Sequence, residues 1–342
     1  MVARRAWPIL LILGVLLLCS VVISAGIGAV WIHPAEVARV VWKHLGGLVN
    51  VPATSDVIIW DLRLPRIALA LLVGAALAVA GALMQSLFHN PMADPYVVGV
   101  SSGAAFGAVV SVACGLQAVS WGALNITSLL AFGCGLAATF LVYGLSRRAG
   151  RVPVGTLLLT GIAIGGLMQA VTSFLLLQQG HSEMREVMAW LMGSMANRGW
   201  SHVLTLLPYT VAGMGIALFL QRELNILALG DETAHHLGVN VERTRLLLLF
   251  TATLLAAAAV AMSGIIAFVG LIIPHLMRLL IGPNHRRLLP ACLLAGGLLL
   301  VWADVLARTL IPSGELPIGI VTSVLGCPFF LYLLHRREGK TF

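Results

Sequence analysis

The number and length of the apolar stretches restrict this chain more than any other feature. The sequence has 342 residues, of which 59% are hydrophobic and 10% charged, and its mean hydropathy is +0.99. These values lie outside the range of soluble globular domains. A helix that crosses about 30 Å of hydrocarbon needs roughly 20 mostly apolar residues, and such stretches recur along the chain. The sequence therefore predicts an all-α, polytopic membrane protein.

Charged, Pro-rich and Gly-rich breaks divide the apolar sequence into ten predicted spans. The seventh and eighth spans are hard to separate, because the stretch from Leu246 to Ile281 scarcely loses its apolar character. A single helix of that length would extend about 54 Å, which is too long for the bilayer core. We therefore expect a turn near Ser263 and Gly264. The ten ranges are 7–31, 64–87, 97–116, 120–145, 154–178, 203–221, 243–263, 265–281, 288–311 and 317–334.

Basic residues are unevenly distributed between the two sides that ten spans define. With both termini in the cytoplasm, the cytoplasmic segments hold 14 of the 21 Lys and Arg residues, as the positive-inside rule requires. The apolar run from Trp7 to Trp31 also resembles a signal peptide, but it is longer than a usual signal core. We expect it to be retained as the first span, since its removal would place the termini on opposite sides.

The sequence contains no obvious energy source of its own. A nucleotide-binding P-loop needs G-x-x-x-x-G-K-[ST], and before Gly339-Lys340-Thr341 the first required glycine is replaced by Leu334. Asp304 is the main carboxylate inside a predicted span, and we expect it to form a structural i,i+4 pair with Arg308. The alternative is an ion-coupled secondary carrier that uses Asp304.

Metal and nucleic-acid sites also lack a sequence signature. His235 and His236 are adjacent, so on a helix they point about 100° apart and cannot chelate one metal from one face. The five cysteines stand singly, without a C-x-x-C pair. The net charge of +8 is spread over short loops, which suits a lipid bilayer and not a nucleic acid. We expect no metal, no nucleic-acid partner and no enzymatic activity in this chain.

Long, ordered motifs cover most of the sequence and resemble the FecCD family of permeases, whose members import ferric siderophores, haem and cobalamin. The motifs are Arg63-Leu64-Pro65-Arg66, Asn90-Pro91-Met92-Ala93-Asp94-Pro95, Phe268-Val269-Gly270-Leu271 with Pro274-His275 and Arg278, and Glu315-Leu316-Pro317-Ile318-Gly319. The resemblance implies a type II ABC importer of the bacterial cytoplasmic membrane. Its parts are two copies of this permease, two cytoplasmic ATPase subunits that bind ATP-Mg, and a periplasmic or extracellular substrate-binding protein. No cofactor is expected on this chain.

The resemblance also implies roles for charged residues at the two ends of the spans. Arg63, Arg66 and Arg308 match family arginines that dock the binding protein, and complementary charge would steer that docking. Anchoring at the lipid headgroups is the alternative. The cytoplasmic segment 225–238 resembles the family's coupling helices, although a simple helix start would also explain its pattern. The coupling residues are Leu227, Gly230, Asp231, Glu232, Leu237 and Gly238.

In this family the substrate path lies between the two copies, beside the fifth and tenth helices, and an outer helix near residues 183–197 stands at the entrance. For the path and entrance we consider His181, Arg185, Met188, Gln169, Thr172 and Ser173. On the fifth span, Thr156 and Thr160 lie about 180° away from the last three, so no continuous polar stripe is predicted. The cytoplasmic gate is expected around Val154 and Gly155.

Haem is the leading substrate prediction, in a mechanism of alternating access. Methionines near the expected entrance would suit a flat apolar ring, and His181 and Arg185 would suit its metal and carboxylates. The same methionines could instead be core, because Met fills irregular gaps. A ferric siderophore is an equal alternative, with cobalamin or an oxyanion below it, and a channel is a further rival. The methionines are Met84, Met168, Met184, Met188, Met192 and Met195.

Overall fold

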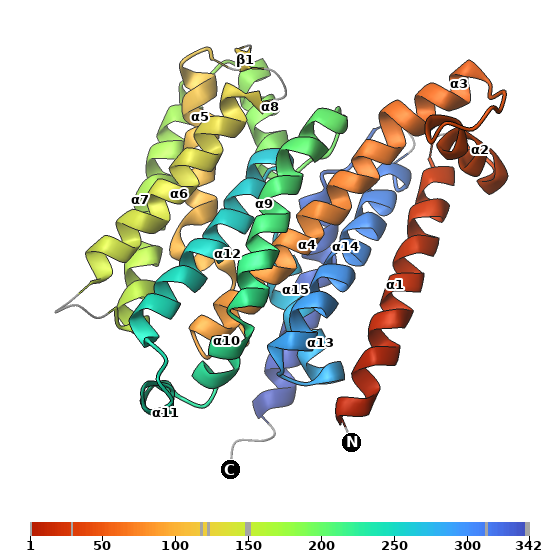
Figure 1. Ribbon diagram of the computed structural model, residues 1–342. Helices are drawn as coiled ribbons and strands as arrows, with labels where there is room; N and C mark the ends of the chain where they lie inside the picture. Colours follow the sequence, from red (N-terminus) through yellow and green to blue (C-terminus); the bar gives the residue numbers. More distant parts are fainter. Residues whose placement is uncertain are drawn as a thin grey trace.

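The protein is a bundle of long apolar helices with short elements at both ends (Figure 1). The computed structural model describes residues 2–28, 30–116, 119–121, 124–147, 152–311 and 314–338. The long helices are α1 (Val2–Gly26), α4 (Leu64–Leu87), α6 (Ile126–Ser146), α7 (Val154–Leu177), α9 (Trp200–Phe219), α12 (Val241–Ser263) and α14 (His285–Thr309). Three further apolar helices are α5 (Val100–Ala113), α13 (Val269–Ile281) and α15 (Ile318–Glu338).

The connecting elements are short. They are α2 (Pro34–His44), α3 (Ala53–Asp56), the π-helical segment η1 (Val57–Arg63), the 3-10 turn η2 (Pro95–Val98), α8 (His181–Leu191), α10 (Gln221–Leu227) and α11 (Asp231–His236). Two-residue strands, β1 (Ser120–Trp121) and β2 (Leu124–Asn125), pair antiparallel. The prediction of an all-α, polytopic fold is confirmed, with this small strand pair as the departure from it.

The ten apolar helices overlap the ten predicted ranges, and the difference between α12 and α13 has a backbone cause. The turn expected at Ser263 and Gly264 is present, because α12 ends there with Gly264 at φ +71°. The helix resumes only at Val269, since Phe268 also adopts a left-handed conformation, at φ +69°. Residues 265–268, predicted as helix, are therefore a non-helical break between α12 and α13. As a result, α13 is only about 20 Å long.

No predicted span covers the segment directly before α4, and the structure makes it helical. α3, η1 and α4 form one continuous helical stretch from Ala53 to Leu87, about 52 Å long at 1.5 Å per residue. Such a stretch is longer than the hydrocarbon core. Arg63 and Arg66 therefore lie within helical backbone and not in a connecting loop.

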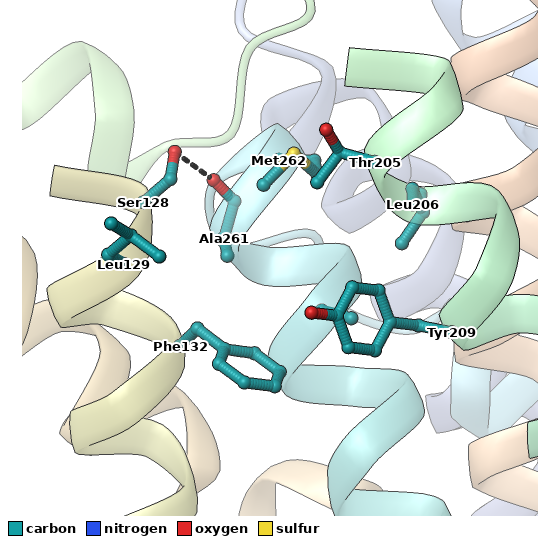
Figure 2. A pocket seen from close by; sticks show the side chains of 9 residues that line it. Ser128, Leu129, Phe132, Thr205, Leu206, Tyr209, Ala261 and Met262 are labelled. Atoms are coloured by element: carbon teal, nitrogen blue, oxygen red, sulfur yellow. Dashed lines mark hydrogen bonds between the residues drawn. The ribbon is translucent and has the colours of Figure 1, made fainter. Parts of the chain in front are cut away.

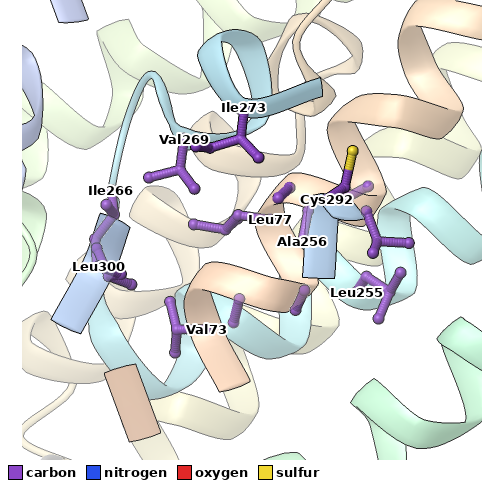
Figure 3. Packing of buried hydrophobic residues seen from close by; sticks show 14 of the residues in the cluster. Val73, Leu77, Leu255, Ala256, Ile266, Val269, Ile273, Cys292 and Leu300 are labelled. Carbon is purple, nitrogen blue, oxygen red and sulfur yellow. The ribbon is translucent and has the colours of Figure 1, made fainter. Parts of the chain in front are cut away.

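Helix α4 lies at the centre of the bundle and is packed closely against α13 and α14 (Figure 3). A Cβ added to Gly74 would overlap the carbonyl of Gly296, and one added to Gly81 would overlap the carbonyl of Gly270. Small residues at such crossings let helix backbones approach closely in lipid. Figure 3 shows Val73 and Leu77 of α4 among the apolar side chains of its neighbours.

Both chain ends lie at the same end of the bundle, which we call the terminus end (Figure 1). α11 also lies at this end, with α10 above it, whereas α2, α3 and α8 lie at the opposite end. This arrangement separates the predicted coupling segment from the predicted docking and entrance residues.

Candidate functional site

A buried charge cluster, formed by Arg63, Arg66, Asp304, Arg308 and Glu315, joins three parts of the chain at the end opposite the termini. Arg66 donates through Nε to Asp304 Oδ1 at 2.8 Å and through Nη1 to Glu315 Oε2 at 2.7 Å. Arg308 Nε lies 3.0 Å from Asp304 Oδ2. The predicted Asp304–Arg308 pair is confirmed, and Asp304, which is 0% exposed, is shared with a second arginine.

The outer two arginines of the cluster also bind backbone carbonyls. Arg63 donates from Nη1 to the carbonyl oxygens of Ala25 and Gly26, at 2.8 and 3.0 Å. Arg308 donates from Nη1 to Ile27 O at 3.1 Å. These bonds satisfy carbonyls that the C-terminus of α1 leaves without intrahelical partners. The guanidinium groups predicted for docking are thus engaged inside the chain, where a partner would have to compete for them.

The predicted coupling segment forms a helix-turn-helix at the terminus end. Gly230, at φ +103°, lies between α10 and α11, and Gly238, at φ +81°, follows α11. Leu227 is buried, whereas Leu237 is 54% exposed. Asp231 and Glu232 begin α11 and are exposed, and Asp231 Oδ2 accepts from Arg245 Nη2 at 2.6 Å. Acidic residues in a first turn suit the positive end of the helix dipole.

A groove of about 1010 Å³ runs beside this segment. One wall comes from α11 and the start of α12, and the other from Val152 and Pro153, directly before α7. The predicted gate residues follow at once: Val154 is half-buried and Gly155 is exposed, with open space where a Cβ would be. The groove brings the predicted coupling segment next to the residues that precede the predicted gate.

The polar residues predicted on the fifth span do not share one environment. Gln169 and Ser173 are exposed, whereas Thr172 is 0% exposed. Thr172 lies close to a small apolar cluster that includes Leu176 of α7 and Val109 of α5. Gln169 and Ser173 therefore share an exposed surface of α7 that Thr172 does not share, and the part of all three in a substrate path stays a prediction.

The outer helix predicted near residues 183–197 is present as α8, shifted to His181–Leu191. His181, Arg185 and Met188 are exposed on it with i, i+4, i+7 spacing, so they share a face. The backbone N–H of Glu183 and the Ser182 hydroxyl hold the pKa of the Glu183 carboxyl below its usual value. Of the six methionines considered for haem, Met84 and Met195 are fully buried in the core, as the alternative of core packing predicts.

A cavity of about 340 Å³ lies where α8, the break after α12 and α15 meet. Backbone bonds assemble it: Ile318 N donates to Gly193 O at 2.9 Å, and Gly319 N donates to Met192 O at 3.1 Å. The sequence predictions missed this cavity, although the glycines that allow the close contacts belong to the quoted motifs. Its lining residues are Leu191, Met192, Ile265, Ala267, Gly319, Ile320, Ser323 and Val324.

Another pocket, between α6, α9 and α12, is shown in Figure 2. Ser128 Oγ donates to Ala261 O across it at 2.8 Å, and Phe132 and Tyr209 face each other. Its volume is about 30 Å³, which is of the order of a single water molecule. It is a packing gap between helices and too small for a transported chelate.

Comparison with known proteins agrees with this architecture. The chain is 48% identical over 289 residues to the cobalamin import system permease protein BtuC of Halobacterium salinarum, covering 84% of this chain and 76% of that protein. It is 41% identical to the hemin transport system permease protein HmuU of Yersinia pestis, covering 96% of each.

A solved structure, described as an inward-facing conformation of a metal-chelate type ABC transporter, has a TM-score of 0.84 and 34% identity and covers 96% of this chain and 99% of that one. The model of the FecCD transport family matches residues 16–336. This match covers eight of the ten apolar helices completely and α1 and α15 in part. The chain belongs to the FecCD transport family.

Proposed function

We propose that this chain is the permease subunit of an ATP-driven importer, and that it moves a metal chelate or a cobalamin-like cofactor across the cytoplasmic membrane by alternating access. The α10–α11 segment carries the proposal. It exposes Leu229 and Leu237 at the terminus end, by 64% and 54% of their surfaces, and exposed apolar side chains rimmed by polar ones mark interaction sites. The sequence has no P-loop, so a separate ATPase subunit is the partner that this surface suits.

The groove beside α11 supports a route from the ATPase to the path. A displacement of α11 would be passed to Val152 and Pro153, which line the same groove, and from there to the start of α7. We therefore keep Val154 and Gly155 as the proposed gate. Each nucleotide state of the ATPase would favour one of two arrangements of this junction, as differential binding requires.

A second copy of the chain is proposed to cover α7 and α15. Ile162, Leu167 and Phe174 on α7, and Val324 on α15, leave more than half of their surfaces exposed. In a dimer these faces would enclose a path, and the 340 Å³ cavity at α8 and α15 would open toward it.

Haem remains the specific substrate that we propose. The exposed face of α8 offers Arg185 to carboxylates and Met188 to an apolar ring, and Met192 lines the adjoining cavity. Cobalamin is the second candidate, because the 48% identical relative is named a cobalamin permease. Uptake assays with haem, cobalamin and a ferric siderophore as competitors would rank these substrates.

We propose that a binding protein docks on the charge cluster by replacing one of its internal ion pairs with an ion pair to the partner. Glu315 is exposed, whereas the arginine that it binds is buried, so a carboxylate of the partner could replace Glu315 on Arg66. Glu315→Gln should then raise the affinity for the binding protein several-fold, because the internal competitor loses its charge. An unchanged or lower affinity in a binding assay would argue against the exchange.

The decisive experiment for the importer is reconstitution with its ATPase and binding protein. ATP-dependent uptake into proteoliposomes is expected, and it should be lost with Leu229→Ser and Leu237→Ser combined, together with ATPase binding. Leu48→Ser, at a fully exposed site between α2 and α3, is the matched control for ATPase binding. A chain that moves solute down an ion gradient without nucleotide would refute the proposal.

A further inference from the structure

A second cavity of about 340 Å³ lies at the terminus end, between the C-terminal ends of α4 and α13 and the start of α14. Its polar lining consists of Gln85, Ser86, His89, His275, Arg278 and His285. None of the residues that line it is Asp or Glu. The cavity therefore combines a cationic side chain with neutral hydrogen-bonding groups, and it is separate from the gate, the α8 entrance and the charge cluster.

Arg278 is the central feature of this cavity. Its Nε and Nη2 atoms are buried, and within the part of the chain that the structure describes they have no hydrogen-bond partner. Nor does any carboxylate of the described residues form an ion pair with Arg278. Arg278 as a whole is half-buried, and a guanidinium with two buried, unpartnered nitrogens gains from a counter-charge, so an external anion is a natural partner.

The other polar groups are positioned by the chain itself. His285 lies with Nδ1 2.9 Å from Asn225 Oδ1 and Nε2 2.7 Å from Ser86 Oγ. Gln85, which is 1% exposed, donates to Leu271 O at 3.0 Å and leaves its Oε1 without a partner in the described residues. The cavity thus has an acceptor as well as a cationic donor, which suits a ligand that carries both an oxyanion and a hydroxyl group.

The surroundings indicate that this ligand comes from the membrane. Leu279 and Leu280 follow Arg278 directly and are 64% and 48% exposed, so apolar surface adjoins the cation at the end of the bundle. Basic pockets between membrane helices on the cytoplasmic side bind anionic lipid headgroups. We propose that this cavity binds the phosphate of an anionic phospholipid with a hydroxyl-bearing headgroup, with Arg278 as the phosphate ligand.

The test uses the full chain purified in mild detergent. Dioleoyl phosphatidylglycerol, dioleoyl phosphatidylcholine and inorganic phosphate are each titrated, and bound lipid is counted by native mass spectrometry while the unfolding midpoint is followed. The wild type should bind phosphatidylglycerol in preference to phosphatidylcholine. Arg278→Gln should weaken that binding about tenfold or more, as loss of a charge-assisted hydrogen bond predicts.

Two further variants keep the test decisive. Arg278→Lys retains the charge and should recover part of the affinity, which a merely misfolded Arg278→Gln protein would not explain. Arg243→Gln, at an exposed arginine in the first turn of α12, should bind phosphatidylglycerol like the wild type. Equal binding by the wild type and Arg278→Gln would overturn the proposal.

The remaining arms separate the possible sources of the anion. Stabilisation by inorganic phosphate that requires Arg278 and competes with the lipid would support the oxyanion site but assign it to a soluble phosphate. Loss of ATPase binding in Arg278→Gln, with unchanged lipid binding, would overturn the proposal in favour of a protein carboxylate. None of these readouts depends on transport, so failure of the lipid-site proposal can be distinguished from failure of the importer proposal.

Discussion

Helices α4 and α7 have the same length and nearly opposite surroundings. Each has 24 residues. In the most apolar part of each helical stretch, however, 83% of the residues are buried for the stretch that contains α4 and 11% for α7. Both are apolar enough to cross a membrane, so hydropathy does not distinguish them. Gly74 and Gly81 of α4 meet the backbones of α14 and α13, whereas a Cβ on Gly155 or Gly166 of α7 would meet open space.

The difference shows what small residues do in the two helices. On α4 they allow neighbouring backbones to touch, which makes this helix the centre of the packed core. On the outer face of α7, Gly155 and Gly166 meet no other part of the described chain, whereas Gly161, on its inner face, approaches the Val97 carbonyl. We therefore expect α4 to respond to substitution as a core element, and α7 to respond as a surface that awaits lipid or a second copy.

The largest difference is expected at the charged end of α4, since α7 contains no charged residue. Asp304→Asn would leave Arg66 and Arg308 without their shared buried counter-charge, and a loss of stability of about 3–5 kcal/mol is expected. Asp231→Asn, in a half-exposed pair with Arg245, should change stability by less than about 1 kcal/mol. Unfolding of both variants in detergent measures this contrast, and equal losses would show that burial is not the cause.

Gly81→Ala should have the next largest effect. The added methyl group would overlap the Gly270 carbonyl, and overpacking of this kind destabilises by about 1–3 kcal/mol or more. The midpoint of thermal unfolding should fall clearly. An unchanged midpoint would mean that α4 and α13 can separate without loss, which would break the distinction between the core helix and the surface helix.

Gly166→Ala on α7 is the matched substitution, and we expect the opposite sign. The methyl group meets no atom within 4 Å, and alanine favours a helix over glycine by up to about 1 kcal/mol. The isolated chain should therefore be slightly stabilised. If the assembled dimer is destabilised while the isolated chain is not, the second copy packs on this face of α7.

The smallest effect is expected for two adjacent residues of α7 that differ in their accessibility to solvent. Ser173→Cys should react readily with a small maleimide, whereas Thr172→Cys should stay largely unmodified, because Ser173 is exposed and Thr172 is fully buried. The background needs the exposed Cys19, Cys114 and Cys327 replaced. Equal labelling of the two variants would show that α7 is rotated relative to the bundle.

Much of the helical framework was predictable from sequence, and the exceptions are instructive. The range predicted for α4 coincides with the helix, because Pro65 lies in its first turn and its apolar run ends at the turn after Leu87. The break after α12 was marked by Gly264. Its full length was not, because the left-handed Phe268 is held by tertiary contacts that local propensity does not report.

The candidate sites were less predictable. Two short helices, α10 and α11, do lie in the segment singled out from sequence, since its glycines and first-turn acids are local signals. Its coupling role stays a prediction. The burial of the arginines was not predictable, because the two carboxylates that pair with Arg66 lie 238 and 249 residues away from it in the sequence. Their docking role stays a prediction.

By itself, the sequence determined that this protein is a bundle of membrane-crossing helices, because transfer of apolar side chains into lipid and satisfaction of backbone hydrogen bonds within a helix are local properties. Only the tertiary structure decided which helix became the core, which arginines were neutralised and which one, Arg278, was left facing a cavity without a carboxylate. Those outcomes depend on which distant side chains meet in space, because the energy of a buried charge is set by its partners and its access to solvent.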